Sequence, residues 1–297
     1  MKEEEFVIEG QPDLLHRIQS EYKNMSKGQK QIAEYISNNY DKAAFITAAK
    51  MGQTVGVSES TVVRFAYAMG YDGYPELQKS LQELIRNKLT SVQRMALSAD
   101  VQEQDVLKSV LKADMGNIRA TIESIDIESF QNVVDALNGA RCVYIIGMRS
   151  STPLAAFMVY YLSWLLDDVR QVSAGPSDTM EQLVGVGPED VAIGISFPRY
   201  SASSVHALCF ARQAGAYTAA ITDSMLSPLA EYAQECLVAR SDMASFVDSL
   251  VAPLSLINAI IFAVGRTNSS RTTERFNRLE RIWNRQGVYI GTEKTEE

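Results

Sequence analysis

The 297-residue chain has few of the side chains that zinc sites, disulfide frameworks and histidine-dependent catalysis require. It contains two histidines and three cysteines, and Cys142, Cys209 and Cys236 are scattered, without metal-ligand spacing. An odd number of scattered cysteines favours small core residues in a reducing compartment. We therefore expect no metal, no cofactor and a cytoplasmic location.

Long apolar segments are also missing. No apolar run reaches the roughly 18 to 20 residues that a membrane span needs. The longest candidates, residues 158–166 and 250–264, contain polar residues and fit buried helices. The chain begins Met-Lys-Glu-Glu-Glu with no apolar segment after it, which predicts the absence of a secretory signal. The 46% hydrophobic content predicts folded cores, and the length suffices for two domains.

The charge is unevenly distributed along the chain. There are 28 Lys plus Arg against 36 Asp plus Glu, a formal net charge of −8. Residues 1–94 hold 12 basic and 12 acidic residues, so the net negative charge lies entirely in the rest of the chain. Residues 42–94 carry seven basic and four acidic residues, which is also compatible with ordinary surface scatter. Because DNA affinity depends on local neutralisation of phosphates, an acidic chain can contain a DNA-binding region.

Residues 26–70 predict short helices joined by tight turns. Ser26, Thr47 and Ser58 each precede a helix-forming stretch and can cap it, while Gly56 suits a left-handed turn between two helices. The expected helices span residues 26–39, 41–45, 48–55 and 59–69. In the last of these, four apolar residues share an inward face, namely Val62, Phe65, Ala66 and Met69.

This arrangement is typical of a helix-turn-helix. Gly52 lies one turn before Gly56, and a small residue there lets two helices cross closely. The short hydroxyls near the helix start suit phosphates, Arg64 can bind guanine through two hydrogen bonds, and Val63 can contact a thymine methyl. The residues expected to contact DNA are Thr47, Ser58, Glu59, Ser60, Thr61, Val63 and Arg64. A plain helical hairpin within a larger fold is the alternative.

From Arg141 onward, apolar strand-like runs alternate with helical stretches. This alternation predicts a parallel sheet covered by helices on both faces, an α/β three-layer sandwich. The expected strands are residues 142–147, 169–172, 191–197, 217–222 and 236–239, and the expected helices are 153–166, 179–184, 202–214, 228–233 and 246–264. Five strands suit the flavodoxin-like order 2-1-3-4-5, in which ligands bind beyond the carboxyl ends of the strands.

Two of these strand ends carry several hydroxyls and an arginine, GMRSST at 147–152 and SFPRYS at 196–201. Hydroxyls and backbone N–H groups at a helix start can bind an anion, and arginine can add two charge-assisted hydrogen bonds. We expect a phosphate ester or similar anion to be bound by Arg149, Ser150, Ser151, Ser196, Arg199 and Ser201, although serines at these positions can also simply cap helices. A Rossmann site is disfavoured because GMRSST lacks the second and third glycines, and no P-loop is present.

Taken together, these segments resemble the RpiR family of bacterial transcription regulators, over about residues 26–265. The family's DNA-binding segment is similar to GVSESTVVRFAYAMGYDGYPELQKSL here, and segments of its sugar isomerase (SIS) domain are similar to IIGMRSS, GISFPRYS, ITDSMLSPLA and SFVDSL. The resemblance implies an all-α helix-turn-helix domain at 1–90, a helical linker at 91–125, a SIS domain at 126–270 and a C-terminal helix and tail at 271–297. It further implies a homodimer, or a tetramer, that binds a palindromic DNA operator and a phosphosugar effector in the bacterial cytoplasm, with no membrane partner.

The chain departs from the general SIS pattern in both loops. Arg149 replaces the second glycine of Gly-x-Gly-x-Ser, and residues 196–201 keep only the outer hydroxyls of Ser-x-Ser-Gly-x-Thr. Pro198 removes a backbone donor, whereas Arg199 adds charge. These differences leave the ligand open between a phosphosugar and another small anion such as a sugar acid.

The competing interpretation is an enzyme, a phosphosugar isomerase with an accessory helical domain. Isomerisation needs an acid or base near the sugar carbons. His206 falls on the helix after SFPRYS rather than at the strand end, and Glu181 and Glu231 suit ordinary surface carboxylates. An architectural DNA-binding protein fits poorly because the chain has no extended basic tail.

The C-terminal stretch RTTERFNRLERIWNRQ alternates Arg and Glu around Phe276, Leu279 and Trp283. This spacing predicts an amphipathic helix. We expect the helix to pack on the SIS-like core or on a partner subunit rather than to contact DNA.

Overall fold

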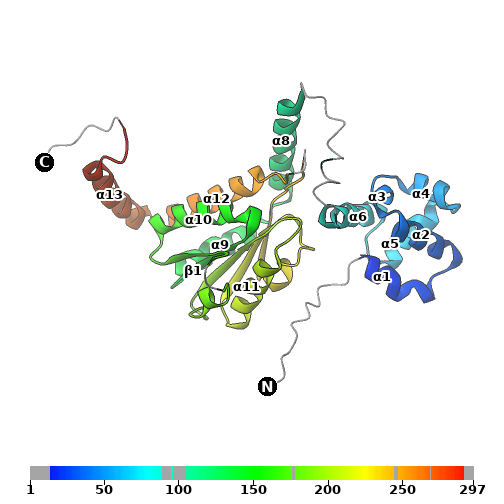
Figure 1. Cartoon of the computed structure of the whole chain (residues 1–297), viewed down its shortest axis with the longest axis horizontal. Coiled ribbons are helices and arrows are strands. Elements are labelled where there is room, and N and C mark those ends of the chain that lie inside the picture. Colours follow the sequence, from blue (N-terminus) through cyan, green and yellow to red (C-terminus); the bar gives the residue numbers. More distant parts are fainter. Residues whose placement is uncertain are drawn as a thin grey trace, which may run out of the picture. The chain divides into compact units, whose positions relative to one another are not determined.

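The computed structural model describes residues 14–88, 95, 105–175, 178–243, 247–267 and 269–290. The chain forms two compact units, residues 1–94 and 95–297 (Figure 1). Each unit has its own buried apolar core.

The N-terminal unit is helical, as expected. Its α-helices are α1 (Leu14–Glu21), α2 (Lys27–Asn38), α3 (Tyr40–Ala43), α4 (Ala48–Val55), α5 (Glu59–Ala68) and α6 (Tyr74–Lys88), with a 3₁₀ turn η1 (Tyr22–Asn24). The three predicted caps are confirmed: the hydroxyls of Ser26, Thr47 and Ser58 each accept a hydrogen bond from a backbone N–H of the first helical turn. Gly56 has φ of 75°, the left-handed conformation that ends α4.

The close crossing of α4 and α5 depends on Gly52. A Cβ atom at this position would lie 2.7 Å from the carbonyl oxygen of Val57, a backbone atom that cannot move aside easily. The connection before α4 is fixed by α6, because the Tyr74 hydroxyl and the Gln78 amide both donate to the Ile46 carbonyl, at 2.8 and 2.9 Å. Burial raises the pKa of Tyr74 to about 12, so this hydroxyl keeps its proton at neutral pH.

The C-terminal unit contains a five-stranded parallel sheet in the order β2-β1-β3-β4-β5, which confirms the predicted topology. Its strands are β1 (Val143–Gly147), β2 (Val169–Val172), β3 (Val191–Ile195), β4 (Tyr217–Thr222) and β5 (Glu235–Val238). Its α-helices are α8 (Val106–Ser124), α9 (Ile127–Gly139), α10 (Thr152–Leu165), α11 (Ala202–Gln213), α12 (Val251–Thr267) and α13 (Ser269–Gln286).

Both faces of the sheet are covered, so its central strands are apolar without alternation. Val143 and Ile145 belong to the core that includes α9, α10 and α12, whereas Tyr144 and Ile146 belong to the core that includes α11. Figure 1 shows α11 on one side of the strands and α10 and α12 on the other.

Two predicted helices are wrong. Residues 179–184 and 228–233 form only single 3₁₀ turns, η4 (Glu181–Leu183) and η5 (Ala230–Tyr232). Each is too short to accumulate α-helical hydrogen bonds after the costly first turn. Helix α12 starts at Val251, five residues later than expected, and residue 246 lies outside the described residues.

Helix α8 lies within the segment expected to link the domains. In the structure it is hydrogen-bonded to Arg240, Asp242 and Ser249, so it belongs to the C-terminal unit. The Asn117 side chain donates to the Asp242 carbonyl at 2.8 Å and accepts from the Asp242 N–H at 3.0 Å. The Arg240 N–H donates to the Thr121 hydroxyl at 2.9 Å, and the Ser249 hydroxyl donates to Asp114 Oδ1 at 2.6 Å. Residue 117 is 2% exposed, so this face of α8 is part of the fold.

The amphipathic C-terminal helix is confirmed as α13, and it packs on α10. The rings of Trp283 and Trp164 lie 5.3 Å apart, and Asp167 accepts hydrogen bonds from Arg271 and Arg275. In the described part of the chain no single helix is long and apolar enough to cross a membrane. Among the described helices, α12 and α13 are long and apolar enough only if they are counted as one segment, and that segment is bent by 105°.

Candidate DNA-binding helix and anion-binding cleft

The first candidate site is the exposed side of α5 and the turn before it. Val62, Phe65 and Ala66 are fully buried, which fixes the helix against the N-terminal core. Ser58, Glu59, Ser60 and Arg64 are exposed, whereas Thr61 and Val63 are half-buried. Thr47 is exposed at the start of α4. The structure therefore leaves all seven residues of the predicted set at least partly accessible on α4 and α5.

The polar groups of α5 are preorganised by one another. The Ser58 hydroxyl lies 2.9 Å from that of Ser60 and 2.8 Å from that of Thr61. Arg64 turns back along the helix, where its Nε donates to the Ser60 carbonyl at 3.3 Å and its Nη2 to the Thr61 hydroxyl at 3.4 Å. These are long, exposed hydrogen bonds, so the guanidinium can leave them at little cost.

The second candidate site is a cleft at the carboxyl edge of the sheet. It has a volume of about 500 Å³. Its walls come from the segments that follow β1, β2 and β3, as expected for a parallel sheet of this order. The described residues that line it are Met148, Arg149, Ala174, Thr179, Arg199, Tyr200, Ser201, Ala202 and Ser203. Two arginines and several hydroxyls thus surround a space that contains no acidic side chain among these lining residues.

Arg149 and Arg199 share an unusual backbone conformation. Their φ angles are 54° and 65°, and they are the only residues other than glycine with positive φ in the described part of the chain. Both occupy positions where the general SIS pattern has glycine, a residue that adopts positive φ without strain. The two loops therefore keep a backbone conformation that suits glycine, and each arginine is strained in it. Strain of this kind persists where the surrounding structure fixes it, and it concentrates at binding sites.

The predicted serines divide into two groups. Ser201 lines the cleft, whereas Ser151 and Ser196 are only 2% and 3% exposed and lie outside its lining. The Ser201 N–H donates to the Ser196 hydroxyl at 3.3 Å, so Ser196 closes the loop. Ser150 is exposed and is likewise absent from the lining.

Sequence reasoning missed Thr179, Tyr200 and Ser203. Tyr200 donates its hydroxyl to Asp223 Oδ1 at 2.8 Å, which ties the loop after β3 to the end of β4. Thr179 belongs to a loop that the sequence suggested was helical. Ser203 could have been found from its place in the first turn of α11, beside Ser201.

The three candidate acid–base residues do not line the cleft. His206 is half-buried on α11, and Glu181 and Glu231 are exposed on the 3₁₀ turns η4 and η5.

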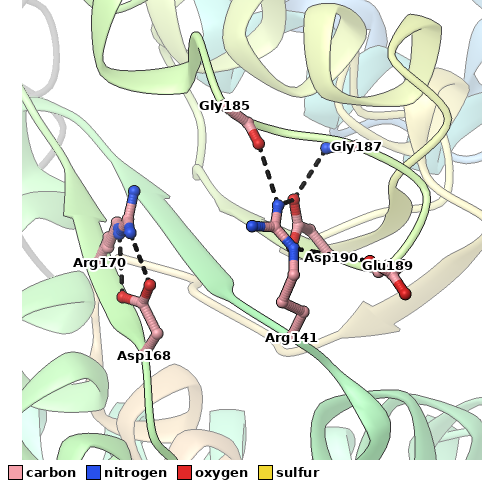
Figure 2. Close-up of polar contacts among 7 residues, drawn as sticks. All are labelled: Arg141, Asp168, Arg170, Gly185, Gly187, Glu189 and Asp190. Carbon is pink, nitrogen blue, oxygen red and sulfur yellow. Dashed lines mark hydrogen bonds and ion pairs between the residues drawn. The ribbon is translucent and has the colours of Figure 1, made fainter.

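A separate charged cluster lies at the opposite, amino edge of the sheet (Figure 2). Arg141 donates to Asp190 Oδ2 at 2.6 Å and to the Gly185 carbonyl at 3.1 Å, and the Gly187 N–H donates to the same carboxylate oxygen at 2.8 Å. Asp190 is 1% exposed, so these contacts hold the loop before β3 against the start of β1. Beside them, hydrogen bonds from Arg170 hold the pKa of Asp168 below its usual value.

Comparison with known proteins accounts for both units. Residues 12–88 match the helix-turn-helix domain of the rpiR family, and residues 136–263 match the SIS domain. An uncharacterized HTH-type transcriptional regulator of Haemophilus influenzae is 29% identical over 230 residues, which cover 76% of this chain and 79% of that protein. The chain belongs to the RpiR family.

Two solved structures share the fold. The sugar isomerase domain of an RpiR transcription factor from Sphaerobacter thermophilus has a TM-score of 0.58 and 27% identity, covering 60% of this chain and 99% of that one. The Vibrio vulnificus NanR protein, solved with ManNAc-6P, has a TM-score of 0.55 and 19% identity, covering 94% of this chain and 100% of that one. Family membership confirms the predicted two-part fold, and it favours a transcriptional regulator over an isomerase.

Proposed function

We propose that this RpiR-family regulator binds a palindromic operator as a homodimer in the cytoplasm, and that a phosphosugar or sugar acid binds in its SIS cleft. The observation that carries the effector assignment is the pair of arginines with positive φ, Arg149 and Arg199, in a cleft that has no acidic side chain among its described lining residues. Two arginines that line one cleft favour an anion strongly.

We assign DNA contact to the seven exposed or half-exposed residues of α4 and α5. Thr47, Ser58 and Thr61 lie at helix starts, where hydroxyl and N–H groups suit phosphate oxygens. Ser60 and Arg64 are exposed on the first two turns of α5 and can meet base edges, with Arg64 suited to guanine. Val63 is half-buried and packs partly against the N-terminal core, and its accessible part can meet a thymine methyl. Glu59 can accept a hydrogen bond from a cytosine amino group.

In the cleft, Arg149, Arg199 and Ser201 are the proposed direct ligands of the anion. Ser150 is exposed near the start of α10, and Ser151 and Ser196 are buried beneath the two loops, where they would support the cleft or bind after a small loop movement. The fold shared with NanR, a protein solved with ManNAc-6P, supports a sugar phosphate as the class to test first.

The effector would act by binding more tightly to one dimer arrangement than to another. Such a preference shifts the equilibrium between the two dimer arrangements, and therefore changes the fraction of dimers that can bind the operator. The size of the shift is limited by the difference in effector binding free energy between the two arrangements.

Footprinting on the DNA upstream of its own gene tests this proposal. We expect a protected palindrome whose occupancy changes with one compound of a sugar phosphate and sugar acid panel, and loss of protection in Arg64→Ala. Isomerase assays on the same panel test the enzyme alternative. No protection at low salt, together with turnover of one compound, would overturn the proposed function.

A further inference from the structure

Helix α8 carries an apolar stripe that the described part of the chain leaves exposed. Leu107, Leu111, Met115 and Ile122 are 71%, 54%, 70% and 70% exposed, and Ile118 is half-buried between them. At 100° per residue these five side chains fall within an arc of roughly 80° on the helix. Figure 1 shows the first half of α8 extending beyond the layer formed by α10 and α12.

This stripe is distinct from the face that α8 uses within its own fold. Asn117 and Thr121 are buried and make the hydrogen bonds to the segment at 240–242. The stripe lies beside that face. Large exposed apolar side chains aligned on one side of a stable helix are typical of a surface that is covered in an assembly.

We infer that the stripe on α8 is an interface with a second copy of this chain, formed by antiparallel pairing of the two α8 helices. This inference rests on the homodimer of the proposed function and assigns the surface that forms it. The spacing of the stripe is self-complementary, because 111, 115, 118 and 122 are placed symmetrically along the helix. In one antiparallel register, Leu111 of each helix lies level with Ile122 of the other, and Met115 lies level with Ile118.

The exposed flank of the stripe favours the antiparallel orientation. Lys108, Lys112, Arg119 and Glu123 lie on the side of the stripe that faces away from the chain's own core, and Arg119 pairs with Glu123 within the helix at 3.4 Å. In a two-fold antiparallel pair, this flank of one helix faces the same exposed flank of the other. A parallel pair would instead turn this flank toward the side of the second helix that is already packed in its own fold.

Sedimentation velocity of the full chain, without DNA or effector, tests the interface. We expect a wild-type dimer, and for Leu111→Glu/Met115→Glu a dimer dissociation constant raised by at least roughly 30-fold, as for central interface residues. The matched control is Val106→Glu, an exposed apolar residue of the same helix that lies off the stripe and is 47% exposed. Circular dichroism should show both variants folded, since all three side chains are exposed.

The outcomes separate this inference from the proposed function. A wild-type dimer that the double variant leaves intact, or that Val106→Glu weakens equally, would overturn only the α8 interface. A chain that is monomeric at every concentration would overturn the homodimer as well.

Thiol crosslinking tests the orientation. Chains with Leu111→Cys and Ile122→Cys should form a disulfide when mixed. Leu111→Cys alone should not crosslink beyond the wild-type background, because the two residues 111 would lie roughly 16 Å apart along the axis. Efficient crosslinking of Leu111→Cys with itself would overturn the antiparallel register.

Discussion

The two candidate sites of this regulator are built in different ways. Arg64 lies on a regular helix, and its hydrogen-bond partners, Ser60 and Thr61, are within one turn of it. Arg149 and Arg199 are 50 residues apart in sequence and reach one cleft only because β1 and β3 are neighbours in the sheet. The DNA-binding surface is therefore a local property of one helix, whereas the cleft is a property of the sheet.

This difference implies that each site can be disabled alone, and the largest effect should come from the cleft. Arg149→Gly/Arg199→Gly removes both guanidinium groups but keeps a residue that adopts positive φ without strain. We expect effector affinity, measured by calorimetry, to fall by about 100-fold or more, since each charge-assisted hydrogen bond contributes roughly 1.5–3 kcal/mol. Operator binding without effector should be unchanged. Arg212→Ala, an exposed arginine on α11, is the control, and an unchanged affinity in the glycine variant would show that the cleft is not the effector site.

Gly52→Ala should damage the N-terminal unit alone. The new Cβ would meet the Val57 carbonyl at 2.7 Å, so we expect a loss of roughly 1–3 kcal/mol in the stability of this unit, with loss of operator binding. Both tryptophans, Trp164 and Trp283, belong to the C-terminal unit, so their fluorescence should report an unchanged transition while circular dichroism shows an earlier one. The same substitution at Gly116, whose Cβ would meet nothing within 4 Å, should not destabilise the chain. Equal shifts of both transitions in Gly52→Ala would indicate that the units are not independent.

Arg64→Ala should have a purely functional effect. We expect operator affinity to fall by about 1–3 kcal/mol, the range for one bidentate base contact, and thermal stability to change by less than about 0.5 kcal/mol. Electrophoretic mobility shifts at fixed salt measure the first quantity and calorimetry the second. Effector binding should match wild type. A loss of operator affinity no greater than that of Arg212→Ala would remove Arg64 from the DNA interface.

The smallest expected effect concerns the docking of α13. Hydrogen bonds from Arg271 and Arg275 lower the pKa of Asp167 below 3.8. The stabilisation is therefore present above about pH 4 and is lost as the pH falls through the lowered value. Because Asp167 is 72% exposed, we expect less than about 1 kcal/mol. Fluorescence of Trp283, whose ring contacts Trp164, should change as the pH falls in wild type but not in Asp167→Asn. The same acid transition in both proteins would show that this carboxylate does not hold α13.

The same difference between the sites explains what the sequence could predict. The capped turn between α4 and α5 depends on Gly52, Gly56 and Ser58, whose effects are local, so the helix-turn-helix could be placed closely. The strand order also followed from alternating apolar runs. By contrast, the roles of Thr179 and Tyr200 depend on how separate loops meet, and the positive φ of Arg149 and Arg199 contradicts the ordinary preference of arginine.

The packing of α8 shows the same limit. The segment is expected to be a helical linker, yet α8 uses two different faces, one bonded through Asn117 to the rest of the C-terminal unit and one exposed. Periodicity locates an amphipathic helix, but only tertiary contacts show which apolar residues remain uncovered.

The most direct test of the central claim is operator occupancy as a function of effector concentration, for wild type and for Arg149→Gly/Arg199→Gly. If the cleft controls the DNA-binding helix, wild-type occupancy should change over the concentration range in which the effector binds. The double variant should occupy the operator equally well without effector but show no response over that range. A double variant that responds at the same concentration as wild type would contradict the assignment of the cleft as the sensor.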